Sequence, residues 1–175
     1  EETGMLESIE GNRPNPRIKP PFPTIKGLFG LPTLINNVET LSNIPAIVLN
    51  GPEWFSAIGT PKSTGTKIFS LSGHVNRPGN YELPLGIPLR ELIEVYGGGV
   101  IGGKKVKAVL PGGSSSAYLT EAHLDTRMDF DSLAQAGTML GSGAVIVMDE
   151  TTCMVEATER LTSFYQHESC GKCTP

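Results

Sequence analysis

The sequence predicts an α+β protein whose centre is one small mixed β-sheet crossed by a helix. Residues 67–150 contain four runs of strand length, separated by turn signals rich in glycine and proline. Two helical segments lie among these runs, which gives the order β-β-α-β-α-β along the chain. A β-grasp arrangement fits that order best, because it places a hairpin and two later strands in one sheet under a helix.

The first two strands form a predicted hairpin. Residues 67–75 (KIFSLSGHV) alternate imperfectly between apolar and polar side chains, as a half-buried strand does. A second strand covers residues 80–83, and the sequence NRPG at 76–79 between the two strands is a turn signal.

The later elements are predicted from the residues at their ends. A helix begins at Pro88, since proline suits a first helical turn, and the glycines of 97–99 end it. Asp129 is the expected cap of a short helix that extends to Ala136. Two apolar strands complete the predicted sheet, at residues 106–110 and 144–148.

Two glycine-rich stretches lack the defining features of phosphate-binding loops. Residues 112–116 (GGSSS) follow a strand, but they lack the lysine of a P-loop and no convincing helix follows them. Residues 97–103 (GGGVIGG) end a helix rather than open one, unlike a dinucleotide-binding fingerprint. We therefore interpret residues 112–116 as a flexible bulge or loop.

A helix is also predicted for residues 1–11, with Thr3 as its cap and Gly11 at its end. As residue types alone, Glu1 and Glu2 are best read as solvated carboxylates, which the positive end of the helix dipole favours. The apolar residues expected to face inward are Met5, Leu6 and Ile9.

Residues 12–34 contain six prolines, so they cannot form a long helix or a central strand. Phe22 lies between two of these prolines on a stiff backbone. Its ring is either a stacking surface for a base or a partner, or a plug that docks the loop onto a core. The residue types alone favour the plug.

Asn36 and Asn37 precede a predicted helix, in which Pro45 should introduce a kink or a break. Two amide side chains at a helix N-terminus suit a polar or anionic ligand, and helix capping explains them equally well. The expected apolar side of this helix carries Val38, Leu41, Ile44 and Val48.

A short helical patch with Trp54, Phe55 and Ile58 follows, and then a polar linker in which we place a domain boundary near residues 63–65. Residues 151–168 read as an amphipathic helix, with Cys153 in its first turn as a small, half-buried residue. The inward residues of that helix are expected to be Met154, Val155, Ala157, Leu161, Phe164 and Tyr165.

The cysteines Cys170 and Cys173 have the C-x-x-C spacing that can direct two sulfurs to one metal centre. His167 just before them is interpreted as a donor to a ligand or as a charge at a helix C-terminus. A [4Fe–4S] cluster needs four cysteines, and the chain has three. We therefore expect this chain to be a piece of a larger redox protein.

The composition narrows the class of protein. A net charge of −4 and a pI near 5.4 argue against a nucleic-acid surface. No apolar run approaches the roughly 20 residues that span a bilayer, so direct membrane insertion is not expected. Three cysteines, two of them in C-x-x-C, suit metal or redox use in a reducing compartment.

Several motifs together resemble the NADH-binding flavoprotein subunit of respiratory complex I, NADH:quinone oxidoreductase. Residues 168–175 (ESCGKCTP) are similar to the cluster signature of that family, and residues 1–8 (EETGMLES) to the tail of its nucleotide-site signature. Gly4 stands where the family usually has alanine. Further similar stretches, in the same order as in the family, are 19–23 (KPPFP), 35–40 (INNVET) and 137–143 (GTMLGSG).

The resemblance implies three domains. Residues 1–65 would be the C-terminal part of an α/β domain for FMN and NADH, residues 66–150 a β-grasp domain of the soluble-ligand-binding type (SLBB), and residues 151–175 the first helix of a helical iron–sulfur domain. In that family hydride passes from NADH to FMN, and single electrons then leave through a [4Fe–4S] cluster towards quinone.

The resemblance also implies roles for individual residues. Glu1 and Glu2 would lie at the FMN and NADH site. Asn36, Asn37 and Thr40 would bind the flavin phosphate or ribityl chain, and Phe22 would stack near the dinucleotide. Cys170 and Cys173 would be two cluster ligands, whereas Cys153 matches no ligand position. We expect the isolated 175-residue chain to be inactive and to bind neither FMN nor a stable cluster.

The implied partners are other subunits of the peripheral arm, including a thioredoxin-like subunit with a [2Fe–2S] cluster. The implied location is cytoplasmic, on the cytoplasmic or matrix face of the inner membrane. Two alternatives remain: the diaphorase subunit of an NAD(P)-linked hydrogenase or formate dehydrogenase, and a non-enzymatic β-grasp binding module with a zinc-type C-x-x-C. The sequence alone leaves the choice between NADH and NADPH open.

Overall fold

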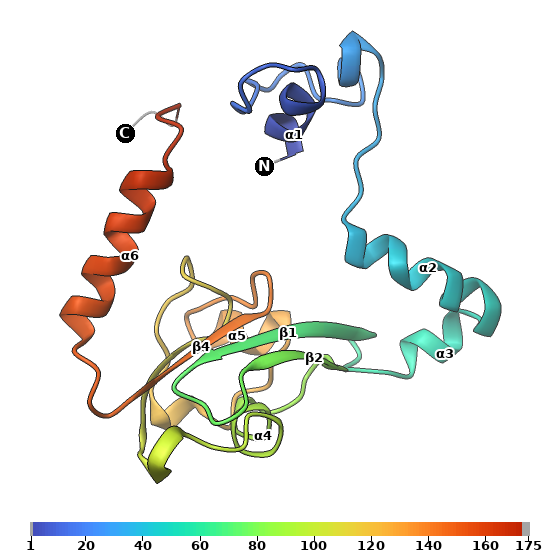
Figure 1. The fold of residues 1–175 in the computed structure, drawn as a ribbon. Coiled ribbons are helices and arrows are strands. Elements are labelled where there is room, and N and C mark those ends of the chain that lie inside the picture. The colour runs from blue at the N-terminus through green and yellow to red at the C-terminus, as the bar shows by residue number, and fades with distance from the viewer. Residues whose placement is uncertain (1, 173–175) are drawn as a thin grey trace. The chain divides into compact units, whose positions relative to one another are not determined.

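The computed structural model describes residues 2–172 (Figure 1). The chain divides into two compact units. We call Pro45–Thr158 the sheet unit, and Glu1–Ile44 with Glu159–Pro175 the outer unit.

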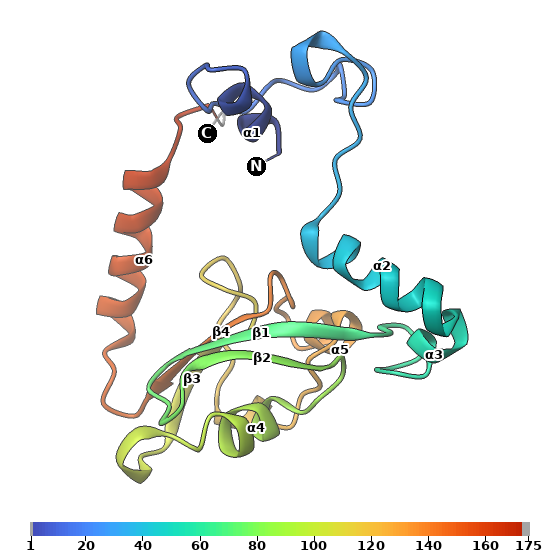
Figure 2. The same ribbon diagram turned by 45° about the vertical axis from the view of Figure 1, so that its right-hand side comes forward.

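Four strands make the sheet of the sheet unit, in the order β2-β1-β4-β3. Strand β1 pairs antiparallel with β2 and parallel with β4, and β3 pairs antiparallel with β4. The first and last strands are therefore parallel neighbours in the centre, as in a β-grasp fold (Figure 2). The predicted fold class is confirmed, and the strands are β1 (Thr66–Gly73), β2 (Gly79–Pro84), β3 (Val106–Leu110) and β4 (Ala144–Asp149).

Helix α4 (Leu89–Glu91) continues as a π-helical turn, Leu92–Tyr96, so the predicted helix exists but changes its period halfway. Asp129 caps α5 (Phe130–Gln135) as predicted, since its Oδ1 accepts a hydrogen bond from the Ser132 backbone N–H at 2.7 Å. Short 3₁₀ turns lie at Ile101–Gly103 and Glu121–His123.

One apolar core lies between the sheet and these helices. Phe69 from β1 and Val145 from β4 are fully buried, together with Leu89 and Leu92 of the helical segment. Alternate residues of each strand enter this core because successive side chains point to opposite faces of a sheet. Of the apolar residues in the imperfect alternation at 67–75, Leu71 and Val75 are buried, whereas Ile68 lies on the other face and is 47% exposed.

The loop at 112–116 closes on itself. The Ser116 hydroxyl accepts from the Gly112 N–H at 3.2 Å and donates to the Gly113 carbonyl at 2.7 Å. A side chain at Gly112 would overlap the carbonyl of Met139, at 2.3 Å. The glycine thus permits close backbone packing, and the loop holds its own polar groups.

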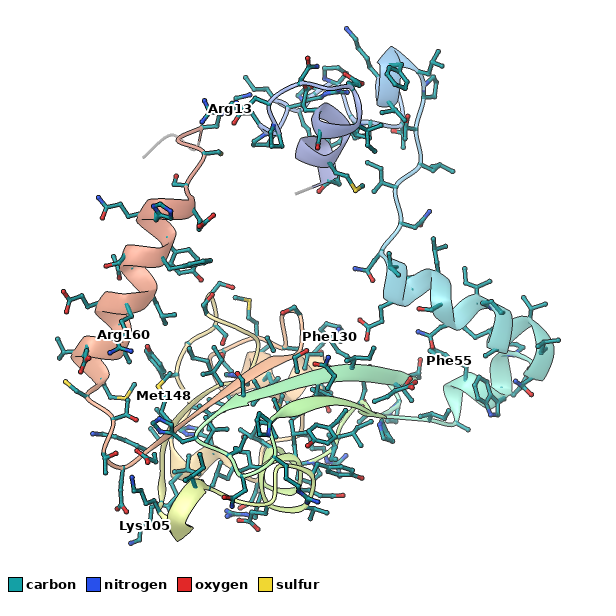
Figure 3. The ribbon with its side chains drawn as sticks, in the orientation of Figure 1. Arg13, Phe55, Lys105, Phe130, Met148 and Arg160 are labelled. Atoms are coloured by element: carbon teal, nitrogen blue, oxygen red, sulfur yellow. The ribbon has the colours of Figure 1, made fainter. Side chains whose placement is uncertain are left out.

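The segment between α3 (Pro52–Ser56) and β1 is packed rather than a bare linker. Ser63 is buried, and a side chain at Gly65 would lie 2.1 Å from the ring of Phe55, which Figure 3 labels beside the start of the sheet. Gly65 has a φ of +88°, which favours glycine as well.

The outer unit begins with α1 (Glu2–Ile9) and ends with α6 (Met154–Glu168), which starts in the sheet unit. Thr3 lies inside α1 rather than at its cap, and its hydroxyl accepts from the Arg17 N–H at 3.0 Å. Leu6 is buried as predicted, whereas Met5 and Ile9 are more than half exposed, which corrects their expected inward position. Gly11 ends the helical turn with a φ of +81°.

Helix α2 (Val38–Asn50) contains Pro45 and runs as one helix, so the predicted break is wrong. Proline removes a single N–H donor, and the remaining hydrogen bonds carry the helix past it. The predicted apolar side of α2 is exposed, as are Val155, Phe164 and Tyr165 of α6. A 3₁₀ turn at Leu28–Gly30 completes the described elements, none of which is a helix long and apolar enough to cross a membrane.

Candidate functional site

A cavity of about 480 Å³ lies on the outer unit. It brings together four residues that the sequence singled out, from α1, from the proline-rich segment and from the approach to α2. These four are Glu2, Phe22, Asn36 and Asn37, and the other lining residues are Pro23, Thr24, Thr33 and Ile35. Glu1 and Cys173, which were also predicted as site residues, lie outside the described residues.

The wall around Phe22 is held by a backbone loop that closes at Thr33. The Thr33 N–H donates to the Pro23 carbonyl at 2.9 Å, and the Thr33 hydroxyl accepts from the Leu28 N–H at 2.8 Å. A side chain at Gly27 would lie 2.4 Å from the Thr33 Cβ and 2.8 Å from the Pro23 carbonyl oxygen. Only glycine therefore allows this closure without displacement of the cavity wall.

Arg17 joins this loop to α1. Its Nη1 donates to the Gly27 carbonyl at 2.8 Å, and its guanidinium pairs with Glu7 and, at 2.8 Å, with Glu10. Hydrogen bonds from Arg17 and from the Phe29 N–H hold the pKa of Glu10 below its usual value, and those to Glu10 and Glu7 raise the pKa of Arg17. Glu10 and the guanidinium are therefore charged at neutral pH.

Glu2 is paired rather than simply solvated, which corrects the expectation from residue type. Its Oε1 accepts from Lys19 Nζ at 2.6 Å, and both side chains are partly buried. Lys19 stands just before the proline pair that leads to Phe22. The cavity is thus lined by an exposed aromatic ring and by a carboxylate that an ammonium group pairs with.

Asn37 caps α2, since its Oδ1 accepts from the N–H groups of Glu39 at 2.9 Å and Thr40 at 3.4 Å. The same side chain lines the cavity, so capping and ligand binding are compatible at this position. Asn36 also lines the cavity and is exposed. Thr40 sits in the first turn of α2 and is not among the lining residues.

This arrangement suits a ligand with an aromatic part and an anionic part. Phe22 offers a face for stacking, and the N-terminus of the 13-residue α2 offers backbone N–H groups and a positive dipole end. Amide side chains add hydrogen-bond donors. A nucleotide or a flavin phosphate combines these features.

Cys170 follows α6 and is exposed, in a turn where the Gly171 N–H donates to the Ser169 hydroxyl at 3.2 Å. Cys153 is also exposed, which corrects its expected half-buried position. The intervening 15-residue helix is about 22 Å long at a rise of about 1.5 Å per residue, so these two thiols cannot share one cluster. Within residues 2–172 no group of three or more His, Cys, Asp and Glu side chains is placed to hold a metal ion.

The sequence did not reveal the roles of Arg17, Lys19, Thr24 and Thr33. The two cations contact acids 7 to 17 residues away, and no helical or strand period links such positions. Gly27 next to a loop of prolines was the one available signal, since an internal glycine indicates close backbone approach.

Comparisons with known proteins show what the chain is similar to. A family model described as the SLBB domain matches residues 67–147. Over all its residues the chain is 57% identical to an NADH-quinone oxidoreductase F subunit (F 2) of Rhizobium meliloti and 55% identical to the NADH-quinone oxidoreductase F subunit of Mycobacterium bovis. It covers 42% and 39% of those two proteins, so it spans about two-fifths of the length of these curated relatives.

Among solved structures, a chain in the crystal structure of NAD⁺-reducing [NiFe]-hydrogenase in the air-oxidized state superposes with a TM-score of 0.85 at 38% identity. The match covers 100% of this chain and 30% of that one. Residues 67–147 therefore form an SLBB domain, and the chain is homologous from end to end to the F subunits of NADH-quinone oxidoreductases.

Proposed function

We propose that this chain is part of an NADH dehydrogenase subunit that takes hydride from NADH onto FMN and passes single electrons to a [4Fe–4S] cluster, feeding quinone reduction. The observation that carries the proposal is the single cavity that collects Glu2, Phe22, Asn36 and Asn37. The names of the F-subunit relatives, at 55–57% identity, support it.

Within the cavity, each residue has a role that its chemistry suits. Asn36, Asn37 and the N-terminus of α2 would hold the flavin phosphate and ribityl chain, and Thr40 in the first turn of α2 would add a hydroxyl. Phe22 would stack on the dinucleotide, and Glu1 and Glu2 would belong to the FMN and NADH site of the whole protein. Lys19 orients the Glu2 carboxylate by their ion pair. FMN, when bound, converts the two-electron hydride donor into one-electron steps.

For the cluster, Cys170 and Cys173 would supply two thiolate ligands. Since Cys153 is a helix length away from Cys170, the other two ligands would come from residues outside 1–175. We also propose the three domains at 1–65, 66–150 and 151–175, with the redox site on the first and last. The isolated 175-residue chain would then be inactive.

The same proposal assigns the partners and the location. The protein would assemble with other peripheral-arm subunits, including the thioredoxin-like [2Fe–2S] subunit, on the cytoplasmic or matrix face of the membrane. A diaphorase role beside a hydrogenase is the second candidate, because the hydrogenase chain has the same fold at 38% identity. The higher identity to the F subunits favours the quinone-linked role. A zinc-type binding module leaves the shared cavity unexplained.

Asn37 provides the first test, since substitution can separate its capping role from a cofactor role. In the full-length protein, Asn37→Asp keeps the cap, because aspartate caps helices as well as asparagine does. It also places a negative charge beside the proposed phosphate. We expect FMN affinity to fall by roughly tenfold or more, about 1.4 kcal/mol, with the helix intact by circular dichroism.

Asn43→Ala is the matched control on the same helix, since the Asn43 amide donates to the Glu39 carbonyl, at 2.8 Å, and does not line the cavity. It should leave FMN affinity unchanged. Unchanged affinity in Asn37→Asp, measured by flavin fluorescence titration, would refute the proposed FMN role of this cavity. Iron and acid-labile sulfide analysis of Cys170→Ser tests the cluster assignment separately.

A further inference from the structure

The strands β1 and β4 separate at His74, where β1 can no longer continue the ladder. Gly73 has a φ of +86°, and a side chain there would lie 2.1 Å from the Val147 carbonyl oxygen. The His74 N–H still donates to that carbonyl at 2.8 Å, but the His74 carbonyl accepts from the Ile101 N–H instead of from β4. The next donor on β4, the Asp149 N–H, therefore lacks a backbone acceptor on β1.

The imidazole of His74 supplies the missing acceptor. The Asp149 N–H donates to His74 Nδ1 at 3.1 Å. Since Nδ1 accepts this bond, it carries no hydrogen in the neutral ring, and the hydrogen sits on Nε2. The side chain of His74 thus extends the parallel ladder by one hydrogen bond.

The carboxylate of the same aspartate lies next to the same nitrogen. Asp149 Oδ1 is 3.3 Å from His74 Nδ1, and the Asp149 side chain is 4% exposed. Oδ1 also accepts from the Thr151 N–H at 3.0 Å and from its hydroxyl at 2.7 Å, and Oδ2 accepts from Lys104 Nζ at 3.0 Å. Hydrogen bonds from Thr151 and then from Lys104 hold the pKa of Asp149 well below its usual range, so its carboxylate stays charged.

This junction is where the chain leaves the sheet for α6. Figure 3 shows α6 departing from the end of the sheet marked by Met148 and Lys105. Lys107 Nζ donates to the Thr152 carbonyl at 2.7 Å, and the Thr152 hydroxyl is 3.5 Å from His74 Nδ1. The charged groups around the imidazole are therefore Asp149 from β4, Lys104 from the segment before β3, and Lys107 from β3.

We propose that His74 and Asp149 form a proton-dependent latch that fixes the exit of the chain from the sheet into α6. In its neutral form His74 accepts from the Asp149 N–H. Once protonated, Nδ1 becomes a donor, so it releases that N–H and bonds to the Asp149 carboxylate instead. The imidazole side chain is 46% exposed, which gives solvent protons direct access. The proposal concerns the sheet unit and is independent of the redox role.

Hydrogen–deuterium exchange of the full-length protein tests the latch. Peptides covering residues 148–153 are followed at about pH 8 and about pH 5, on either side of the range where histidines change charge. Rates are divided by the intrinsic rate at each pH. We expect protection in the wild type to fall at the lower pH by roughly fivefold, the equivalent of the ~1 kcal/mol of one net hydrogen bond.

His74→Asn separates the two states, because an asparagine Oδ1 can take the place of Nδ1 as acceptor and does not titrate. Its profile should be flat. His123→Asn is the matched control, since His123 Nδ1 serves a separate turn at Thr120. In His123→Asn, the protection of residues 148–153 should fall at the lower pH as it does in the wild type. A flat wild-type profile, or a fall that persists in His74→Asn, would overturn the proposal.

A second measurement reads the tautomer of the imidazole directly. Long-range ¹H–¹⁵N correlation spectra of ¹⁵N-histidine-labelled protein at about pH 8 report the tautomer of each ring. The signals of His74 are assigned by their absence from the spectrum of a folded His74 variant or by selective relaxation labelling. We expect these signals to show the hydrogen on Nε2. A hydrogen on Nδ1 would contradict the acceptor role.

Discussion

Each of the two units of this chain is stabilised internally by a different kind of contact. In the sheet unit, buried apolar side chains from β1, β4 and α4 form one core. In the described part of the outer unit, Leu6 is the one buried apolar side chain, and Thr3 is buried beside it. There the contacts are polar: Arg17 pairs with Glu7 and Glu10, and Lys19 pairs with Glu2.

The apolar core that contributes most of the stability therefore lies in the sheet unit, and the candidate site lies in the outer unit. Apolar burial is strong and insensitive to charge, whereas partly exposed ion pairs are weak and screened by solvent. The cavity lies in the outer unit, whose contacts are mostly polar. The sheet unit is the stable scaffold, and its core does not depend on titratable groups.

The largest expected effect follows from removal of a core side chain in the sheet unit. Phe69→Ala deletes a fully buried ring on β1, and such truncations cost about 3–5 kcal/mol through lost burial and a residual cavity. Ile68→Ala, the neighbour on the opposite face, is 47% exposed and should cost less than about 1 kcal/mol. Urea denaturation followed by circular dichroism measures both. Equal losses would show that the two faces of β1 are equally important.

A smaller effect is expected from Gly27→Ala in the outer unit. The added Cβ would overlap Thr33 and the Pro23 carbonyl, and such overpacking costs typically about 1–3 kcal/mol. Because Pro23 and Thr33 line the cavity, we expect their displacement to weaken nucleotide binding by the full-length protein and to leave the sheet unit unchanged. Gly79→Ala on β2 is the control, since its nearest neighbour would be 3.6 Å away. Binding of NADH and FMN by titration calorimetry, together with the melting of the sheet, distinguishes the two regions.

The same contrast explains which parts of the structure could be predicted from the sequence and which could not. The strands were predictable from their apolar runs and the turn signals between them, whereas the imperfect alternation at 67–75 did not give the buried face, since Ile68 is exposed and Phe69 is buried. The cavity residues Phe22, Asn36 and Asn37 were found through their motifs. The pairs of Arg17 and Lys19 were not, because long charged side chains meet by tertiary folding and leave no periodic signal.

Amphipathic patterns had a related limit. They correctly predicted helices at α2 and α6. They did not predict whether the apolar side of each helix is covered, because the period of a sequence shows which side is apolar but not which residues pack against it. The inward positions expected for Met5 and Ile9 failed for the same reason. Both helical segments nevertheless begin close to their predicted positions.

The smallest effect is expected from acidification, which weakens the ion pairs of Arg17 with Glu7 and Glu10. These pairs are partly exposed, so solvent screens them. The pKa of Glu10 in the folded chain is below its usual value of 4.5. A carboxyl with a depressed pKa stabilises the fold at pH values above its unfolded pKa, and that contribution is lost as pH falls through the folded pKa. The outer unit should therefore loosen below about pH 4.5 while the core around Phe69 stays protected.

Hydrogen exchange of the full-length protein between neutral pH and about pH 3, corrected for intrinsic rates, measures this for peptides from α1 and from β1. Glu10→Gln keeps an oxygen that can accept from the Phe29 N–H but has no charge to lose, so its outer unit should be looser at neutral pH and change less with acid. Glu53→Gln on the exposed surface of α3 should behave like the wild type. If α1 and β1 lose protection together at one pH, the two units share a single source of stability, and the division between a polar site and an apolar scaffold does not hold.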